Sequence, residues 1–326
     1  MRVVLLPGDG IGPEVTGAAR EILGQIAPDL ELEEHTFGGA AILETGTPLP
    51  DETLAACTAA DAVLLGAVGL PQFDAADVRP EQGLLGLRKS LGVYANLRPA
   101  RGDGIDMMIV RELVGGLYFG EKGIRDDGTW FDTCEYSKPE VERIAHRAFE
   151  IARARGGRLT SVDKVNVMHT SKLWREVVTE MGATHYADVP LDHALVDSFA
   201  MTIVQAPETI GTVLTENTFG DILSDVAAAV TGGLGLAASA SIGDADPGLF
   251  EPVHGSAPDI AGQGLANPAA MLRSVALMLR HGLHRSDDAV ALERAIDEAL
   301  DDAPTGDLGG TATTRDMGDA VLSRLG

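Results

Sequence analysis

The chain has 326 residues, of which 45% are hydrophobic and 23% are charged, and its formal net charge is −24. This apolar content excludes intrinsic disorder, and the length predicts about two domains. The acidic excess argues against nucleic-acid and membrane-surface partners, because phosphate backbones and anionic lipids would be repelled.

The N-terminal segment and the cysteine content predict a cytoplasmic protein. The apolar run before Pro7 is too short for the core of a signal peptide. Cys57 and Cys134 are too few for a disulfide framework and are expected to be thiols in a reducing compartment. The longest uncharged stretch, 226–243, is rich in glycine and hydroxyl residues, which predicts no membrane-spanning segment.

Strands and helices are predicted to alternate along the chain. In order, we expect a strand at 2–6, a helix at 14–26, a helix start at 48–51, a strand at 62–67, a strand at 107–111, a helix at 138–155, a strand at 159–163, a helix around Trp174, a strand at 212–214 and a helix after Gly220. This order is typical of an α/β protein with a largely parallel sheet. The polar, turn-rich segment 120–135 interrupts it and is predicted to be a protruding hairpin that buries Trp130 and Phe131 on a partner.

A glycine cluster, 8–13, lies between the first strand and the first helix. A dinucleotide-binding turn needs its third glycine three positions after the second, so that the helix packs closely on the strand. Here the third glycine is Gly12, and Pro13 follows it. The cluster is therefore either a variant phosphate-binding turn or a tight turn without phosphate contact.

Asp221 and Asp225 are spaced to lie on one face of a helix. Carboxylates at this spacing repel each other unless a cation lies between them, and oxygen ligands favour Mg²⁺ or Mn²⁺. The alternative is a solvated helix face. The apolar residues 226–230 that follow place this helix inside the protein and favour the metal site.

Three basic side chains stand out in the acidic chain. Arg88 and Arg98 flank 94–97 and could clamp a dicarboxylate, or they could form ordinary ion pairs. Lys164 lies in the strand-like stretch 161–167, as either a snorkelling edge residue or a functional amine. A nearby divalent cation would favour the loss of the proton that a lysine base requires.

The segment 251–262 has no amphipathic period and mixes turn formers with His254 and Asp259. Small residues allow a ligand to approach the backbone, and an acid in such a loop can hold ribose hydroxyls. The alternative is a long surface loop, although loops of this length are often functional.

Together these stretches resemble one family, the β-decarboxylating 2R-hydroxyacid dehydrogenases. The similarity extends over nearly the whole chain and is most specific at 79–85, 94–99, 220–225 and 251–262. It implies a two-domain α/β fold with a large mixed sheet, distinct from the classical Rossmann fold. The NAD-binding domain would comprise 1–95 and 236–326, and the dimerisation domain 96–235. The active site would lie between the domains and be completed by a second subunit, which the arm at 120–135 would clasp.

The resemblance implies oxidation of a 2R-hydroxy acid at C2 by NAD⁺, followed by loss of the β-carboxylate as CO₂. Lys164 matches the base for the C2 hydroxyl, and Tyr136 matches the acid that protonates the enolate. Asp197, Asp221 and Asp225 match the carboxylates that bind Mg²⁺ or Mn²⁺, with Asp197 and Lys164 supplied by the partner chain.

The resemblance also implies ligand-binding residues. Those for the substrate are Arg88, Arg98 and Arg125 for the carboxylates, with Leu84, Leu85 and Val167 around the C3 substituent. Those for the cofactor are Glu81 and Asn166 at the nicotinamide end, Asp259 at the adenosine ribose, Asn267 at the adenine, and His254, Gly255, Ser256, Ala257 and Ile260 between them. An acid at the ribose repels a 2′-phosphate, which favours NAD over NADP.

The apolar residues Leu84, Leu85 and Val167 favour isopropylmalate, an intermediate of leucine biosynthesis, as the substrate. Burying an unpaired carboxylate against them would cost several kcal/mol, which disfavours isocitrate and homoisocitrate. Tartrate and malate are weaker alternatives, because a smaller substituent loses about 1–3 kcal/mol. A catalytically silent ligand-binding homologue is the non-enzyme alternative. The loss of Lys164, Tyr136 or a helix aspartate would be its signature, and all are present.

The composition predicts a salt-dependent stability. The chain has 5 lysines, 20 arginines and 28 aspartates, a pattern found in proteins adapted to molar salt, where ions screen the self-repulsion. We expect the thermal unfolding temperature to rise by several degrees between dilute buffer and molar KCl. An unchanged melting temperature across that range would contradict this interpretation.

Overall fold

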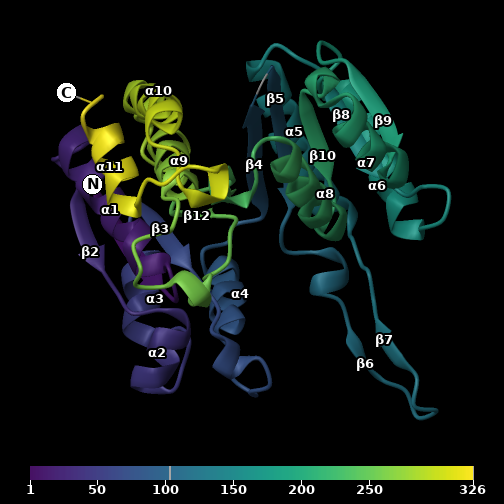
Figure 1. Ribbon diagram of the computed structural model, residues 1–326. Coiled ribbons are helices and arrows are strands. Elements are labelled where there is room, and N and C mark those ends of the chain that lie inside the picture. The colour runs from purple at the N-terminus through teal and green to yellow at the C-terminus, as the bar shows by residue number, and fades with distance from the viewer. Residues whose placement is uncertain (103, 326) are drawn as a thin grey trace. The chain divides into compact units, whose positions relative to one another are not determined.

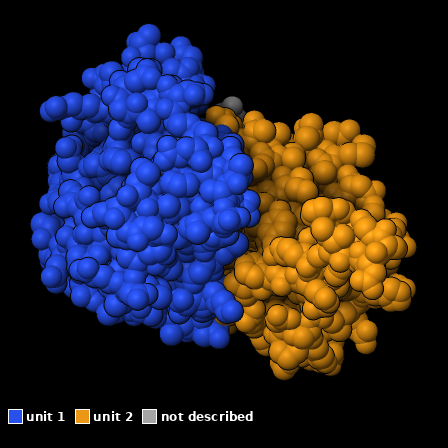
Figure 2. All heavy atoms as spheres, turned by 90° about the horizontal axis from the view of Figure 1, so that it is seen from below, with its two compact units in different colours: residues 1–93, 234–326 blue, residues 94–233 orange. Residues whose placement is uncertain are grey.

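Residues 1–102 and 104–325 are described by a computed structural model, drawn as a ribbon in Figure 1. They form two units, coloured separately in Figure 2. Unit 1 comprises Met1–Val93 and Leu234–Gly326, and unit 2 comprises Tyr94–Gly233. The predicted boundaries, after residues 95 and 235, lie two positions further along the chain than these.

Unit 1 is built on strands that pair mostly in parallel. In spatial order they are β2 (Glu31–Glu34), β1 (Arg2–Gly8), β3 (Ala62–Ala67), β12 (Gly248–Pro252) and β11 (Ala238–Ile242). The pairs β1–β2, β1–β3 and β3–β12 are parallel, whereas β11–β12 is antiparallel. A short connection joins β11 to β12, and short connections produce antiparallel neighbours. The strands therefore form a mixed sheet, as the family resemblance implied, in which most of the pairs are parallel.

The helices of unit 1 pack against these strands and against each other. They are α1 (Gly12–Ile26), α2 (Gly38–Thr45), α3 (Asp51–Thr58), α4 (Pro80–Ser90), α9 (Ala269–Leu277), α10 (Ser286–Asp302) and α11 (Thr314–Leu322), with short helices η1 (Pro71–Phe73), η4 (Leu234–Leu236), η5 (Pro258–Ile260), η6 (Met278–Gly282) and η7 (Gly306–Leu308). The turn before α1 is tight because Gly10, at a φ of 58°, approaches the carbonyl of Ser256.

Unit 2 has a second set of paired strands. In spatial order they are β4 (Ala95–Gly102), β5 (Ile105–Glu112), β10 (Thr212–Thr215), β8 (Leu159–Asp163) and β9 (Leu191–Leu195). The β4–β5 pair is antiparallel and the others are parallel. The helices are α5 (Lys138–Ala154), α6 (His169–His185), α7 (Val196–Gln205) and α8 (Asn217–Val230), with η2 (Gly116–Tyr118) and η3 (Pro207–Thr209).

The buried side of α7 and α8 meets the strands of unit 2 in an apolar core. The core residues include Met107 and Ile109 from β5, Phe199 and Ile203 from α7, and Leu223 from α8. Because α8 is anchored along this buried side, the polar side chains of its first turns are held at defined positions beside the end of β5. This packing positions the candidate metal carboxylates.

The segment 120–135 forms the predicted hairpin. Strands β6 (Lys122–Ile124) and β7 (Trp130–Asp132) pair antiparallel and extend away from the other strands of unit 2 (Figure 1). Trp130 is 79% exposed and Ile124 55% exposed in the single chain. The Arg125 guanidinium lies 4.6 Å from the ring centre of Phe131. Of the helices formed by 1–102 and 104–325, none is long and apolar enough to cross a membrane.

Candidate functional site

Asp221 and Asp225 lie on one face of α8, and the guanidinium of Arg98 is close to both. Arg98 nitrogens lie 3.4 Å from Asp221 and 3.5 Å from Asp225. Arg98 also donates to Ser224 Oγ at 2.7 Å and to Asn96 Oδ1 at 2.8 Å, which fixes its orientation. Burial raises the pKa of Asp225, and the positive charge of Arg98 opposes this. The predicted repulsion between the two carboxylates is therefore relieved by arginine in the single chain.

A second arginine, which the sequence analysis did not single out, contacts one of these carboxylates, that of Asp221. Arg111, at the end of β5, is 4% exposed. Its guanidinium donates to Asn217 Oδ1 at 2.7 and 3.0 Å and forms a close ion pair with Asp221. Gly220 makes room for it, because a Cβ there would lie 2.6 Å from Arg111 Cγ. An arginine that directly follows the apolar run 107–110 was the available signal.

Arg125 lies elsewhere, in the turn of the β6–β7 hairpin. Its backbone N–H donates to the Thr129 carbonyl at 2.9 Å, and its guanidinium covers the Phe131 ring. These contacts stay within the hairpin, whereas Arg111 contacts Asp221 directly. The geometry thus favours Arg111 over Arg125 as the third arginine near the acidic face of α8.

Lys164 and Asp197 form a separate ion pair in unit 2. Lys164 Nζ lies 2.5 Å from Asp197 Oδ1, and this hydrogen bond lowers the pKa of Asp197. Strand β8 ends at Asp163, as predicted, so Lys164 follows the strand and the strand-like stretch 161–167 is only partly a strand. There the Asp163 carboxylate accepts the backbone N–H of Val165 at 2.9 Å and turns the chain, while Ser171 Oγ accepts the N–H of Lys164 at 3.0 Å.

The three predicted metal carboxylates do not come together within one chain. In residues 1–102 and 104–325, no group of three or more histidine, cysteine, aspartate or glutamate side chains is arranged to hold a metal ion. Asp197 is paired with Lys164, and Asp221 and Asp225 with arginines. A second copy of the chain would have to bring the two sets together.

Tyr136, the predicted acid, is held in a slot between glycine backbone and Trp174. The Trp174 ring meets it edge-on at 5.5 Å between ring centres. A Cβ on Gly115 or Gly116 would lie 2.6 Å from the tyrosine. Burial raises the pKa of Tyr136, and the nearby carboxylates raise it further. Tyr136 also lines a pocket of about 400 Å³ with Glu135 and the two glycines.

The carboxylate beside Tyr136 predicts a pH-dependent stability. Glu112 is fully buried, and burial raises its pKa above the ordinary value of 4.5. The folded chain therefore binds a proton more tightly than the unfolded chain does. The contribution of Glu112 to stability is greatest below the pKa that it has in the unfolded chain. This contribution falls as the pH rises through the pKa that Glu112 has in the folded chain.

We therefore expect Glu112→Gln to become more stable relative to the native chain as the pH rises from about 4 to about 8, because the variant has no carboxyl group that must lose its proton. The quantity compared is the free energy of unfolding. Urea unfolding at a series of pH values measures this difference. A difference that is constant with pH, or that shrinks as pH rises, would contradict the assignment.

In unit 1, Arg88 lies near the end of α4 and pairs with a buried acid. Its guanidinium donates to Glu251 Oε1 at 2.7 Å. In the single chain Arg88 therefore forms the ordinary ion pair that was the alternative to a clamp for a dicarboxylate. Leu84 is half-buried on the same helix, and Leu85 is 42% exposed. Glu81, in the first turn of α4, lies against Gly69.

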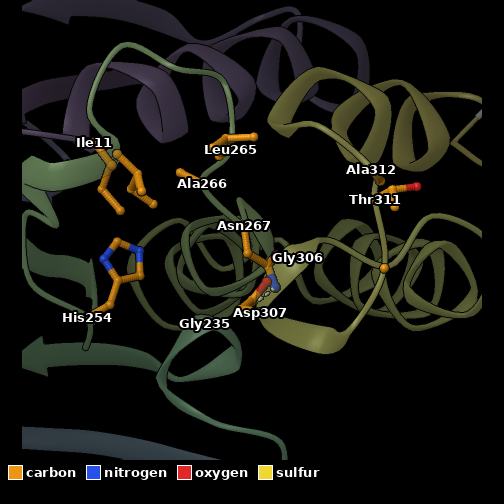
Figure 3. Close-up of a pocket in the computed structure, with 12 residues that line it drawn as sticks. Ile11, Gly235, His254, Leu265, Ala266, Asn267, Gly306, Asp307, Thr311 and Ala312 are labelled. Atoms are coloured by element: carbon orange, nitrogen blue, oxygen red, sulfur yellow. Dashed lines mark hydrogen bonds between the residues drawn. The ribbon is translucent and has the colours of Figure 1, made fainter.

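The segment 251–262 contributes to a pocket of about 460 Å³ in unit 1 (Figure 3). Ile11, His254, Ile260 and Asn267 line it, and Asn267 Nδ2 donates to Asp307 Oδ2 at 3.0 Å. The pocket is mostly apolar. His254 Nε2 is a buried atom with no hydrogen-bond partner within the described residues, and burial lowers the His254 pKa.

The remaining predicted cofactor residues are distributed between the two units. Ser256 is buried, and its carbonyl accepts the N–H of Ile11 at 2.8 Å. Ala257 has a φ of 38°, and Asp259 is exposed in η5. Gly255 is also exposed. Asn166 and Val167 are both exposed after β8 in unit 2, with Val167 68% exposed.

The comparisons with known proteins agree with each other. Residues 2–321 match the family described as isocitrate/isopropylmalate dehydrogenase. The chain is 51% identical over 350 residues to a 3-isopropylmalate dehydrogenase of Anaeromyxobacter dehalogenans, with 99% of each chain covered. It is also 51% identical to the 3-isopropylmalate dehydrogenase of Deinococcus radiodurans, with 100% of this chain and 98% of that protein covered.

Among solved structures, the isocitrate dehydrogenase of Methylococcus capsulatus matches this chain with a TM-score of 0.92. The two are 37% identical, and the match covers 99% of each chain. The family match spans nearly all of the sequence, and the relatives are similar over their full length. The chain therefore belongs to the isocitrate/isopropylmalate dehydrogenase family.

Proposed function

We propose that this chain oxidises (2R,3S)-3-isopropylmalate with NAD⁺ and decarboxylates it to 4-methyl-2-oxopentanoate and CO₂, in leucine biosynthesis. The observation that carries this proposal is the full-length similarity to proteins named 3-isopropylmalate dehydrogenase. The arginines Arg98 and Arg111 beside the carboxylates of α8 support it. A hydroxy-diacid that is bound together with a metal ion needs carboxylates for the ion and arginines for its own carboxylates.

The residues of unit 1 suit the cofactor and the substrate side chain. The apolar pocket with the unpartnered His254 Nε2 fits an adenosine group, which has polar atoms on a flat apolar ring system. Asn267 lines that pocket, and Asp259 lies next to its lining residue Ile260. Leu84 and Leu85, on the accessible side of α4, offer an apolar surface to the isopropyl group.

The donor set of unit 2 fits a divalent cation. Asp221 and Asp225 present carboxylate oxygens on one helix face, the ligand type that Mg²⁺ and Mn²⁺ prefer. Asp197 would be the third ligand. When bound, the cation supplies Lewis-acid stabilisation of negative charge on the C2 oxygen, and NAD supplies the hydride acceptor.

The chain's own residues then have separate roles. Arg88, Arg98 and, by its position beside Asp221, Arg111 orient the substrate carboxylates so that C2 is held for hydride transfer. Lys164 takes the proton of the C2 hydroxyl. Tyr136 returns a proton to C3 after CO₂ has left.

We also propose a cytoplasmic homodimer with shared active sites. In it, Lys164 and Asp197 of one chain would serve the site that contains Asp221 and Asp225 of the other. The hairpin β6–β7 would contact the partner through Trp130, which is largely exposed in the single chain.

A substrate panel tests the proposed activity. NADH formation would be measured with 3-isopropylmalate, isocitrate, homoisocitrate, tartrate and malate, with Mg²⁺ or Mn²⁺, in dilute and in molar KCl. We expect the highest kcat/KM with 3-isopropylmalate and NAD. A preference for isocitrate, or equal turnover with NADP, would refute the proposed substrate or cofactor. No turnover with any acid would favour the ligand-binding alternative.

A further inference from the structure

Two buried carboxylates face the hydroxyl of Tyr136. Glu112 Oε2 lies 3.4 Å from Tyr136 Oη, and Glu216 Oε2 lies 3.3 Å from it. The backbone N–H of Asn217 donates to the same hydroxyl at 3.0 Å. Glu112 is fully buried and Glu216 is 6% exposed. The proposed function uses Tyr136 but leaves both glutamates without a role.

Hydrogen-bond counting distinguishes the two glutamates. A phenol has one proton to donate, and the Asn217 N–H already occupies one acceptor position on its oxygen. Tyr136 can therefore donate to one carboxylate, and the other is satisfied if it carries a proton and donates it to Tyr136. Leaving a buried ionised oxygen unpaired would be costly.

Burial raises the pKa of Glu112, but backbone donors and the Arg143 guanidinium lower it and so partly oppose that effect. Glu112 accepts the backbone N–H of Gly115 at 2.8 Å and contacts Arg143 at 3.3 Å. Arg143 in turn lies over the Tyr94 ring at 4.6 Å. A carboxylate with backbone donors and a guanidinium partner is the better acceptor for the Tyr136 hydroxyl.

Glu216 is placed to carry the additional proton. It is the residue before α8, and its Oε1 caps that helix by accepting the N–H of Phe219 at 2.7 Å. The cap leaves Oε2 facing Tyr136 Oη. Burial raises the pKa of Glu216, and hydrogen bonds from Phe219 and Thr218 partly oppose it.

The groups around this cluster are contributed by five parts of unit 2. The titratable and charged ones are Arg111 and Glu112 from β5, Tyr118 from η2, Cys134 and Tyr136 from the segment before α5, Arg143 from α5 and Glu216 beside α8. Arg143 and Arg111 balance the two carboxylates, so the cluster can lose a proton and regain it without an uncompensated buried charge.

We propose that Glu216 is a positioning residue that supplies the proton with which Tyr136 is regenerated, while Glu112 orients the Tyr136 hydroxyl. This inference rests on the proposed function. In the step, the Tyr136 O–H bond breaks as a C–H bond forms at C3, and the electron pair of the O–H bond remains on Tyr136 Oη. The Glu216 O–H proton then moves to that oxygen.

The protons lost and gained in one turnover are equal in number. One proton leaves the C2 hydroxyl and enters solvent through Lys164, and one proton from solvent restores the Glu216 carboxyl. C3 receives the proton that Tyr136 carried. No oxidant or reductant beyond NAD is needed.

The variant Glu216→Gln tests this role, because glutamine keeps the helix cap but has no acidic proton to transfer. We expect kcat with 3-isopropylmalate to fall by about ten-fold, while KM stays within about two-fold. In the native enzyme kcat should decline as pH rises and the Glu216 carboxyl ionises, and this decline should be absent from the variant.

Matched variants separate the proton role from a structural one. Glu140→Gln, which alters the capping box of α5 near Tyr136, should retain native kcat. Glu216→Asp keeps an acidic proton and should recover at least part of the lost kcat. This variant still tests the role of Glu216 if Glu216→Gln does not fold. Adding Glu216→Gln to Tyr136→Phe should cause no further loss, because the two residues act in one proton transfer.

The outcomes distinguish this inference from the proposed function. A native kcat and pH profile for Glu216→Gln, or a further loss on the Tyr136→Phe background, would overturn the role of Glu216 alone. Full activity of Tyr136→Phe would instead overturn the proposed role of Tyr136, and with it this inference.

Discussion

Replacing Lys164 with alanine is expected to lower kcat by about 10³-fold, with little change in KM. In the proposed mechanism Lys164 takes the proton of the C2 hydroxyl, and no other amine of the described chain is paired with Asp197. Folding should be preserved, because the Lys164 side chain is 26% exposed and that of Asp197 is 65% exposed, and exposed ion pairs contribute little stability. Steady-state kinetics and thermal unfolding measure the two effects.

Lys172→Ala is the matched control, because Lys172 is an exposed lysine of α6 in the same unit. It should retain native activity. If Lys164→Ala kept more than about a tenth of the native kcat, Lys164 would not be the base.

The same residue tests whether active sites are shared. A purified mixed dimer of Lys164→Ala and Asp221→Asn chains should regain about half of the native activity. In that dimer one site combines the intact Asp221 of one chain with the intact Lys164 of the other. Each variant alone should be nearly inactive. An inactive mixed dimer would show that both residues act within one chain.

Replacing Arg111 with lysine is expected to lower kcat/KM by about 10²-fold or more. The planar guanidinium contacts Asn217 and Asp221 at once, and a lysine ammonium cannot reproduce that geometry. Lysine keeps the positive charge beside Asp221, so the expected loss reflects orientation rather than charge.

Arg125→Ala and Arg101→Lys complete this comparison. Arg125 contacts its own hairpin, and Arg101 is an exposed residue of β4 near Asp106. Both variants should stay within about three-fold of the native kcat/KM. A large loss for Arg125→Ala with a small loss for Arg111→Lys would restore the assignment made from the sequence.

The arginines at α8 change the interpretation of its two aspartates. Sequence spacing suggested that a cation is needed to relieve their repulsion, but Arg98 and Arg111 relieve it in the single chain. A cation that bound there would therefore compete with arginine for carboxylate oxygens. Its binding would leave the guanidinium groups able to turn to another anion, such as a substrate carboxylate.

The sequence by itself determined the elements with strong local signals. The strand 62–67 and the helix that begins at Lys138 were predicted because an uninterrupted apolar run and a Ser-Lys-Pro-Glu start are local features. The hairpin at 120–135 followed from its turn residues. Strand β4 was missed because its residues, which include Arg98 and Pro99, have no apolar run, and its pairing with β5 stabilises it instead.

The tertiary structure alone decided which charged groups meet. Arg111 and Asp221 are 110 positions apart, and Tyr136 and Glu216 are 80 apart, so no local pattern links them. Their contacts arise because the ends of β5 and β10 and the start of α8 converge in unit 2. Local sequence encodes the backbone preference of a segment, whereas the partner of a buried charge depends on which segments the fold brings together.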